Sequence, residues 1–182
     1  MRRGAFLVGL MVVLLAGCGS SGSGERSLEL PDATEATSAP PPEQGVPPVA
    51  EPGPAGDCPY LDAGFVESTN GQRVGETRIS AVSGGGTPAC FFYRSDGDVQ
   101  VTVQVFQGEP EVAKAFVDRA APVDTSNPAA LDGGWEGGSQ PTDAGAVYAV
   151  AKEGNAIVVT TNQEQTIKAK LIAEEAIGVL GL

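Results

Sequence analysis

The chain of 182 residues contains no histidine. Histidine is the commonest general base in enzymes and the commonest transition-metal ligand, so Ser-His-Asp sites, Cys-His sites and ordinary zinc sites are excluded. No Ser-x-x-Lys arrangement of the penicillin-binding type occurs either. Acidic residues are plentiful enough that a chance carboxylate pair carries no evidence of glycoside hydrolysis. We therefore predict that the protein is not an enzyme and uses no metal or cofactor.

Positive charge is also scarce, with 11 Lys and Arg against 23 Asp and Glu. Phosphate contacts depend on Lys and Arg, so this balance argues against nucleic acid as a partner. It likewise gives no polybasic stretch that would hold the protein on anionic lipids. The strongly acidic composition is instead typical of a soluble, well-solvated domain.

A long apolar run that could span a membrane is missing, and a shorter one stands at the start of the chain. Arg2 and Arg3 precede small and apolar residues from Gly4 to Ala16, which is the pattern of a secretory signal peptide. The run ends in Leu-Ala-Gly-Cys, which resembles the lipobox of bacterial lipoproteins. An ordinary secretory peptide that happens to end near a cysteine is the alternative. The lipobox predicts a signal peptide over residues 1–17, acylation of Cys18, and a lipid anchor on the extracytoplasmic face of the cell membrane.

Residues 18–56 are rich in Pro, Gly, Ser and Ala and contain no aromatic side chain. Such a composition buries too little apolar surface to offset the entropy of ordering. We expect this segment to be a disordered tether, partly stiffened by its prolines. A proline-motif ligand for a partner is the rival interpretation.

Two cysteines remain once Cys18 is assigned to the lipid. In an exported chain an even pair predicts a disulfide, here between Cys58 and Cys90. Two free thiols in a reactive site are the alternative, although neither a histidine nor a Cys-x-x-Cys spacing supports them.

The rest of the chain, residues 57–182, is long enough for one domain. Its first half predicts a short helix that starts at Asp57 and ends at Asn70-Gly71, then a strand over 77–82. A hairpin follows, in which strands 90–94 and 98–107 flank the turn Asp96-Gly97. Alternating valines from Val99 to Val105 mark the buried face of the second strand.

A helix is then expected from Glu109-Pro110-Glu111, since Pro and acidic residues suit a first turn. A second hairpin is predicted from strands 146–151 and 156–161, and a closing helix follows to about Leu180, with Thr161 and Glu164 as its capping box. The expected buried residues of the closing helix are Ile167, Leu171, Ala176, Ile177 and Leu180. The fold class is therefore α+β, an antiparallel sheet built from two hairpin-plus-helix units with the helices packed on it.

Three sequence segments carry a resemblance to a known family. They are Cys58-Pro59-Tyr60-Leu61, Cys90-Phe91-Phe92-Tyr93-Arg94 and Thr160-Thr161-Asn162-Gln163. Together they resemble an uncharacterised family of actinobacterial lipoproteins, described only as a domain of unknown function. The resemblance covers residues 57–182 and implies a location on the outer face of the cytoplasmic membrane. Related mycobacterial lipoproteins further imply a sandwich similar to the Mog1/PsbP fold, which by itself says little about function.

The connection from Ala121 to Gly145 is long for a compact domain, and long ordered loops are often functional. It contains the only tryptophan, Trp135, between two glycine pairs. The ring is expected either to plug the edge of the core, which we prefer, or to clamp a sugar or acyl chain.

The same connection is rich in oxygen ligands. Those that could hold Ca²⁺ are Asp124, Thr125, Ser126, Asn127 and Asp132. They lack the alternation and the bidentate Glu of a calcium loop, and turn chemistry explains them.

Two functions from different classes remain. The first is a non-catalytic module that docks an envelope protein through a sheet edge or through the Trp135 loop. The second is a carrier that holds a lipid or glycolipid between helix and sheet.

Overall fold

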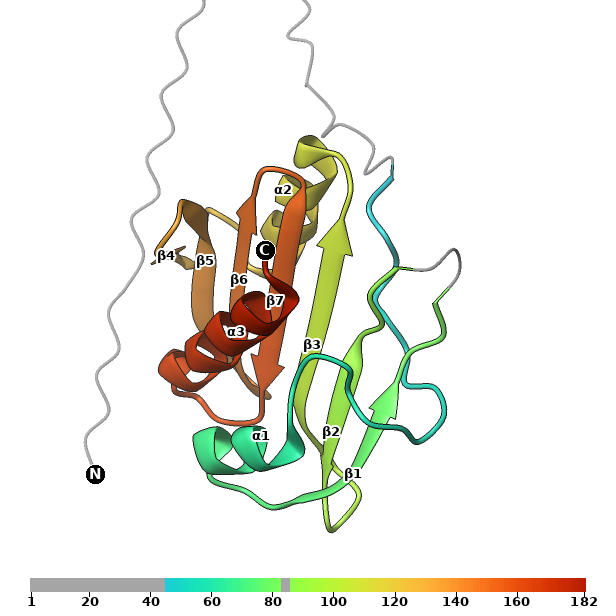
Figure 1. Ribbon diagram of the computed structural model, residues 1–182. Helices are drawn as coiled ribbons and strands as arrows, with labels where there is room; N and C mark the ends of the chain where they lie inside the picture. The colour runs from blue at the N-terminus through green and yellow to red at the C-terminus, as the bar shows by residue number, and fades with distance from the viewer. Residues whose placement is uncertain (1–44, 83–85) are drawn as a thin grey trace, which may run out of the picture. The chain divides into compact units, whose positions relative to one another are not determined.

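The structure is a computed structural model that describes residues 45–82 and 86–182. The predicted signal peptide, Cys18 and most of the predicted tether lie outside the described residues. The described part forms one seven-stranded antiparallel sheet with three helices (Figure 1). The predicted α+β class is confirmed, and none of the helices in this part is long and apolar enough to cross a membrane.

The strands are ordered β1-β2-β3-β7-β6-β5-β4 across the sheet, so β3 and β7, which are far apart in sequence, pair at its centre. In chain order the elements are α1 (Ala63–Asn70), β1 (Val74–Ile79), β2 (Cys90–Arg94), β3 (Val99–Gln107), α2 (Pro110–Ala120), β4 (Asn127–Leu131), β5 (Trp135–Thr142), β6 (Gly145–Lys152), β7 (Asn155–Thr161) and α3 (Thr166–Leu180). Both expected hairpins, β2–β3 and β6–β7, are present, and each is followed by a helix. A description as two such units leaves out α1, β1 and the β4–β5 hairpin.

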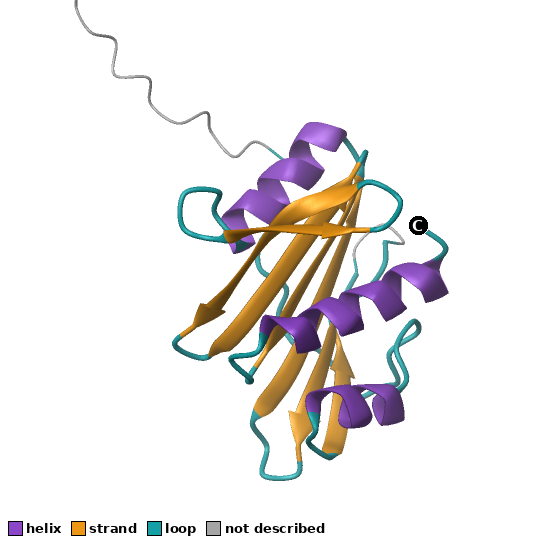
Figure 2. Cartoon of the chain, turned by 90° about the vertical axis from the view of Figure 1, so that its left-hand side faces the viewer, coloured by secondary structure: helices purple, strands orange, loops and turns teal. Residues whose placement is uncertain are grey.

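The sheet is covered on both faces, because the central strands alternate between two apolar sets. In β6, Val147 and Ala149 pack with α2, whereas Tyr148 and Val150 pack on the side of α1 and α3. Figure 2 shows α2 on one face and the other two helices on the opposite face. The molecule therefore has three layers and two separate helix–sheet interfaces.

The folded domain begins before Asp57, the expected boundary. Residues 45–56, which the composition assigned to the tether, run along β1 and onto the sheet. The contacts are backbone hydrogen bonds from Gly53 N to Ile79 O (3.1 Å), from Gly56 N to Thr77 O (3.0 Å) and from Ile79 N to Pro54 O (3.2 Å), and a bond from Ala50 N to Gln104 Oε1 (3.1 Å). Prolines are tolerated at a sheet edge, because proline has no backbone N–H and an edge position does not require one to pair with a neighbouring strand. A proline-rich composition therefore did not exclude packing.

The Cys58–Cys90 disulfide is confirmed, with Cα atoms 5.6 Å apart. Cys90 is the first residue of β2 and is completely buried. The bridge attaches the segment that precedes α1 to the sheet.

The first helix starts later than expected. Its N-cap is Asp62, whose carboxylate accepts a hydrogen bond from Phe65 N at 3.1 Å, and not Asp57. The predicted end is confirmed, since Gly71 caps the helix in the left-handed conformation at φ 77°. The next strand spans Val74–Ile79, three residues before the expected 77–82.

The expected capping box of the closing helix is wrong. Thr161 is the last residue of β7, and its hydroxyl donates to Gln163 O at 2.9 Å. The helix N-cap is Gln165, which makes no side-chain capping bond. The predicted buried face is also wrong in part, because Ile167 and Leu171 are 55% and 44% exposed. The residues that are fully buried in α3 are Ala169, Ile172, Ala173 and Ala176.

The long connection after α2 is not a loop. Most of it forms β4 and β5, which pair with each other and with β6. Gly133 and Gly134 occupy the tight turn between the two strands, with φ of 84° and 88°. The glycines next to Trp135 therefore serve a hairpin and its close packing, not a flexible binding loop.

Candidate functional site

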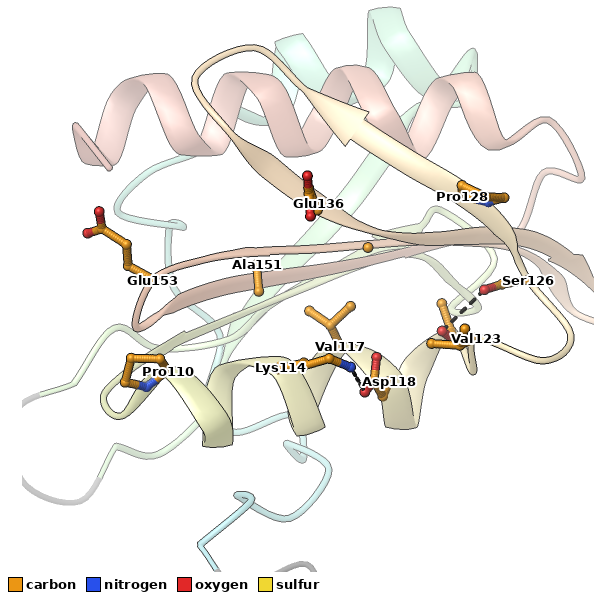
Figure 3. A pocket seen from close by; sticks show the side chains of 12 residues that line it. Pro110, Lys114, Val117, Asp118, Val123, Ser126, Pro128, Glu136, Ala151 and Glu153 are labelled. Carbon is orange, nitrogen blue, oxygen red and sulfur yellow. Dashed lines mark hydrogen bonds and ion pairs between the residues drawn. The ribbon is translucent and has the colours of Figure 1, made fainter.

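A cleft of about 410 Å³ opens between α2 and the β4–β5 hairpin (Figure 3). Its lining comes from five parts of the chain: α2, the turn that follows it, the β4–β5 hairpin, the end of β6 and the β6–β7 turn. The lining residues are Pro110, Lys114, Val117, Asp118, Ala121, Val123, Ser126, Pro128, Glu136, Gly137, Ala151 and Glu153. The volume lies within the range of small-ligand sites, which is about 300–1,000 Å³.

The helix α2 supplies one wall because it is amphipathic. Ala113, Phe116 and Val117 are buried against the sheet, while Lys114 is exposed on the outer side. Pro110 occupies the first turn, as the sequence predicted. The helix therefore presents apolar Val117 together with charged Lys114 and Asp118 to the cleft.

Glycine allows the hairpin to approach the end of α2. A Cβ atom at Gly138 would lie 2.3 Å from Ser126 Oγ and 3.0 Å from the Ala121 Cβ. The Ser126 hydroxyl donates to the carbonyl oxygen of Pro122 at 2.8 Å, which holds the turn after the helix. The close approach at Gly138 thus places Ser126 and Ala121, which line the cleft, directly beside the hairpin.

The charges around the cleft are mostly negative. Lys114 is paired with Asp118 one helical turn away. Glu136 and Glu153 are exposed on β5 and on the β6–β7 turn (Figure 3). Val123 adds an apolar side chain that is 72% exposed. The cleft combines an apolar floor with an acidic rim.

Trp135, the residue singled out from the sequence, lies on the other face of the sheet. It is the first residue of β5 and only 2% exposed, and it belongs to the apolar cluster that contacts α1 and α3. The ammonium group of Lys152 lies 5.9 Å from the centre of its ring. The preferred expectation of a core plug agrees with this placement, and the expectation of a loop position is wrong.

A cluster of side-chain amides was missed. Asn70 Nδ2 lies 3.1 Å from Gln100 Oε1 and 3.2 Å from Asn162 Oδ1, and Asn162 Nδ2 donates to Gln72 Oε1 at 2.9 Å. Lys168 Nζ joins the end of α1 to α3 by donating to Asn70 O at 2.8 Å. The cluster links α1, β3 and the β7–α3 connection, and Asn70 Oδ1 is buried in it with no hydrogen-bond partner in the described structure.

A β-bulge brings Gln100 into this cluster. Val101 pairs with Phe92 while Val99 pairs with Tyr93, so Gln100 is the extra residue of β3. Bulges re-aim side chains, and this one turns a glutamine that the alternation assigned to the outer face into a buried position. The only sequence signal was the Asn162-Gln163 part of the motif at the end of β7.

The described part of the chain contains no group of three or more Asp, Glu or Cys placed to hold a metal ion. Two tyrosine hydroxyls have a perturbed pKa. Burial raises the pKa of Tyr60, whose hydroxyl donates to Pro88 O at 2.9 Å. Burial, together with the negative charge of Glu174, raises the pKa of Tyr148 to about 12. Both hydroxyls stay protonated at neutral pH and hold backbone carbonyls in the core.

The comparison with protein families decides what this domain is. Residues 42–182, more than three quarters of the chain, match a domain of unknown function, DUF2020. The chain belongs to this uncharacterised domain family. The DUF2020 match begins at residue 42, close to the first described residue, and includes the segment 45–56 that packs on the sheet. No curated protein matches the chain.

Proposed function

We propose that this protein is a lipid-anchored lipoprotein of the extracytoplasmic face of the cell membrane, in which the DUF2020 domain is a non-catalytic interaction module. The lipobox-like Leu-Ala-Gly-Cys run supports the anchor at Cys18 and a bacterial context, and the resemblance of the three domain segments supports an actinobacterial one. The anchor and export remain proposals that rest on the sequence.

The observation that carries the module is the cleft beside α2. It is open to solvent, and it has an apolar floor and charged edges. Such an arrangement suits docking of a partner segment better than chemistry on a small substrate. An envelope protein is the proposed partner.

The carrier of lipid or glycolipid is the alternative, and it needs space between helix and sheet. The α3 interface beside Trp135 is occupied by closely packed small and branched side chains, among them Ala169, Ile172 and Ala173. That packing favours the interaction module. Native mass spectrometry of the purified mature chain measures co-purifying lipid directly.

The three layers also support a relationship with the Mog1/PsbP sandwich, with the two hairpin-plus-helix units as its central part. We propose this relationship as a matter of fold alone, because such a likeness transfers no function.

Membrane fractionation tests the anchor. Cys18→Ser should release the protein from membranes, because two acyl chains provide the stable attachment. Unchanged membrane retention of this variant would contradict the proposed acylation.

Site-specific photo-crosslinking tests the module. A benzoylphenylalanine placed at Val123, in the cleft, should give a discrete product with an envelope protein in the native host. The same probe at Val179, which is 57% exposed on α3, is the matched control on the opposite face. Equal products from both positions, or none from Val123, would contradict a docking role for the cleft.

A further inference from the structure

The acidic rim of the cleft is only partly neutralised from within. Lys114 and Asp118 pair with each other across one turn of α2. Among the ion pairs formed within residues 45–82 and 86–182, none involves Glu136 or Glu153. Two carboxylates at the cleft are therefore available to a cation from outside.

The floor next to these carboxylates is apolar. Val117 and Ala151 approach each other from α2 and β6 (Figure 3), and Ala121 also lines the cleft. Lysine and arginine combine an aliphatic stem with a cationic head, so they bury the stem on apolar surface while the head reaches a charged or wet rim. The cleft offers both parts at once.

We infer that the cleft binds a lysine- or arginine-containing segment of a protein partner, with the stem on Val117 and Ala151 and the cationic head at Glu136 or Glu153. This inference rests on the proposed function, because it names the chemistry of the partner that the module would dock. Charge complementarity selects this occupant: the surplus of acidic side chains repels phosphate-bearing and other anionic groups and attracts cationic ones.

The backbone at Glu153 provides a variant that separates charge from folding. Glu153 has φ 53°, and it is the one non-glycine residue with positive φ in the described chain. Left-handed backbone is unfavourable for residues that carry a Cβ atom, whereas glycine adopts it freely. Glu153→Gly should therefore remove a carboxylate while leaving the melting temperature unchanged or higher.

The experiment uses the full chain with benzoylphenylalanine at Val123 in the native host. The crosslinked product is quantified, and the partner peptide joined to the probe is sequenced by mass spectrometry. The test variants are Glu136→Gln/Glu153→Gln and Glu153→Gly. The control is Glu164→Gln/Glu175→Gln, which makes the same change of charge at two exposed carboxylates away from the cleft.

We expect the peptide joined at Val123 to contain lysine or arginine close to the crosslink. The product should fall about three- to tenfold in the double glutamine variant, as expected for the loss of two exposed ion pairs. It should fall in Glu153→Gly without a lower melting temperature, and it should not change in the control.

The inference is overturned if the Val123 product persists undiminished in the double glutamine variant, or if the probe joins a neutral or acidic peptide. A product with a lipid or glycolipid overturns it as well and favours the carrier. If a protein is captured at Val123 in these cases, the inference about the chemistry of the partner fails, but the proposed docking role of the cleft stands. Absence of any Val123-specific product removes both the inference and the proposed function.

Discussion

The Cys58–Cys90 disulfide should supply a large share of the stability of the domain. It closes a loop of 32 residues, and the loss of loop-closure entropy in the unfolded chain is worth about 3.7 kcal/mol for that length. A domain of about 140 residues has an unfolding entropy near 0.3 kcal/mol/K at its midpoint. The reduced protein should therefore melt about 10–13 °C below the oxidised protein.

The measurement compares two forms of the mature chain that carries Cys18→Ser, so that only the two domain cysteines remain. The wild-type pair is oxidised in one sample and, in the other, reduced in denaturant and refolded with reductant. Reduction is preferred to substitution because Cys90 is completely buried, and its replacement by alanine would add a separate packing loss. Calorimetry gives both midpoints, and Cys58→Ala/Cys90→Ala shows how much packing adds. A difference under about 3 °C, or two alkylatable thiols in the exported protein, would refute the reasoning.

Three further predictions concern the core. Trp135→Ala should lower the free energy of unfolding by about 3–5 kcal/mol, as large aromatic deletions in cores do. The wild-type tryptophan should show blue-shifted fluorescence that acrylamide quenches poorly. An unchanged thermal midpoint and free acrylamide quenching would contradict its burial. Asn70→Asp should destabilise the domain by about 3 kcal/mol or more at neutral pH and by less in acid. The reason is that a buried carboxylate would face the Gln100 Oε1 acceptor at the position of the lost donor. An equal drop in the thermal midpoint, relative to the wild type, at pH 4 and at pH 7 would argue against it. Because the pKa values of Tyr60 and Tyr148 are raised, the folded chain keeps protons that the unfolded chain loses above about pH 10. The free energy of unfolding should therefore fall as pH rises from 10 toward 12. Urea titrations should show a shallower fall for Tyr148→Phe.

Features set by neighbouring residues were predictable from the sequence. Asp96-Gly97 forms the expected turn, with Gly97 at φ 93°. Val101 and Val103 are completely buried as expected, whereas Val99, which was assigned to the same face, is 40% exposed. The cysteine pair was predictable because, in a chain that the sequence predicts to be exported, a disulfide is the usual state of two cysteines. These features depend on short-range geometry and covalent chemistry, which a sequence states directly.

The candidate cleft could not be predicted in the same way. Its rim residues Asp118, Glu136 and Glu153 come from a helix, a strand and a turn, and no spacing in the sequence marks them as neighbours. What brings them together is the pairing of β5 with β6 and the packing of α2 against both strands. The segment 45–56 was assigned to the tether for a related reason. Composition shows how much apolar surface a segment has, but it does not show whether an edge strand is available to pair with its backbone.

The closing helix shows most clearly why burial is not set by hydrophobicity alone. Ile167 and Leu171 are among the more apolar residues of α3, yet they face solvent, while Ala169, Ala173 and Ala176 are completely buried. Close contact between a helix and a sheet leaves room only for small side chains beneath the helix axis, where a larger residue would force the layers apart. The alanines therefore face the sheet because they permit the close approach, and Ile172 fills the space that remains between them. The distance between helix and sheet decides which side-chain volumes fit beneath the helix, and no local sequence pattern encodes that distance. Ranking the residues of a helix by hydrophobicity alone therefore selects the wrong face in such cases.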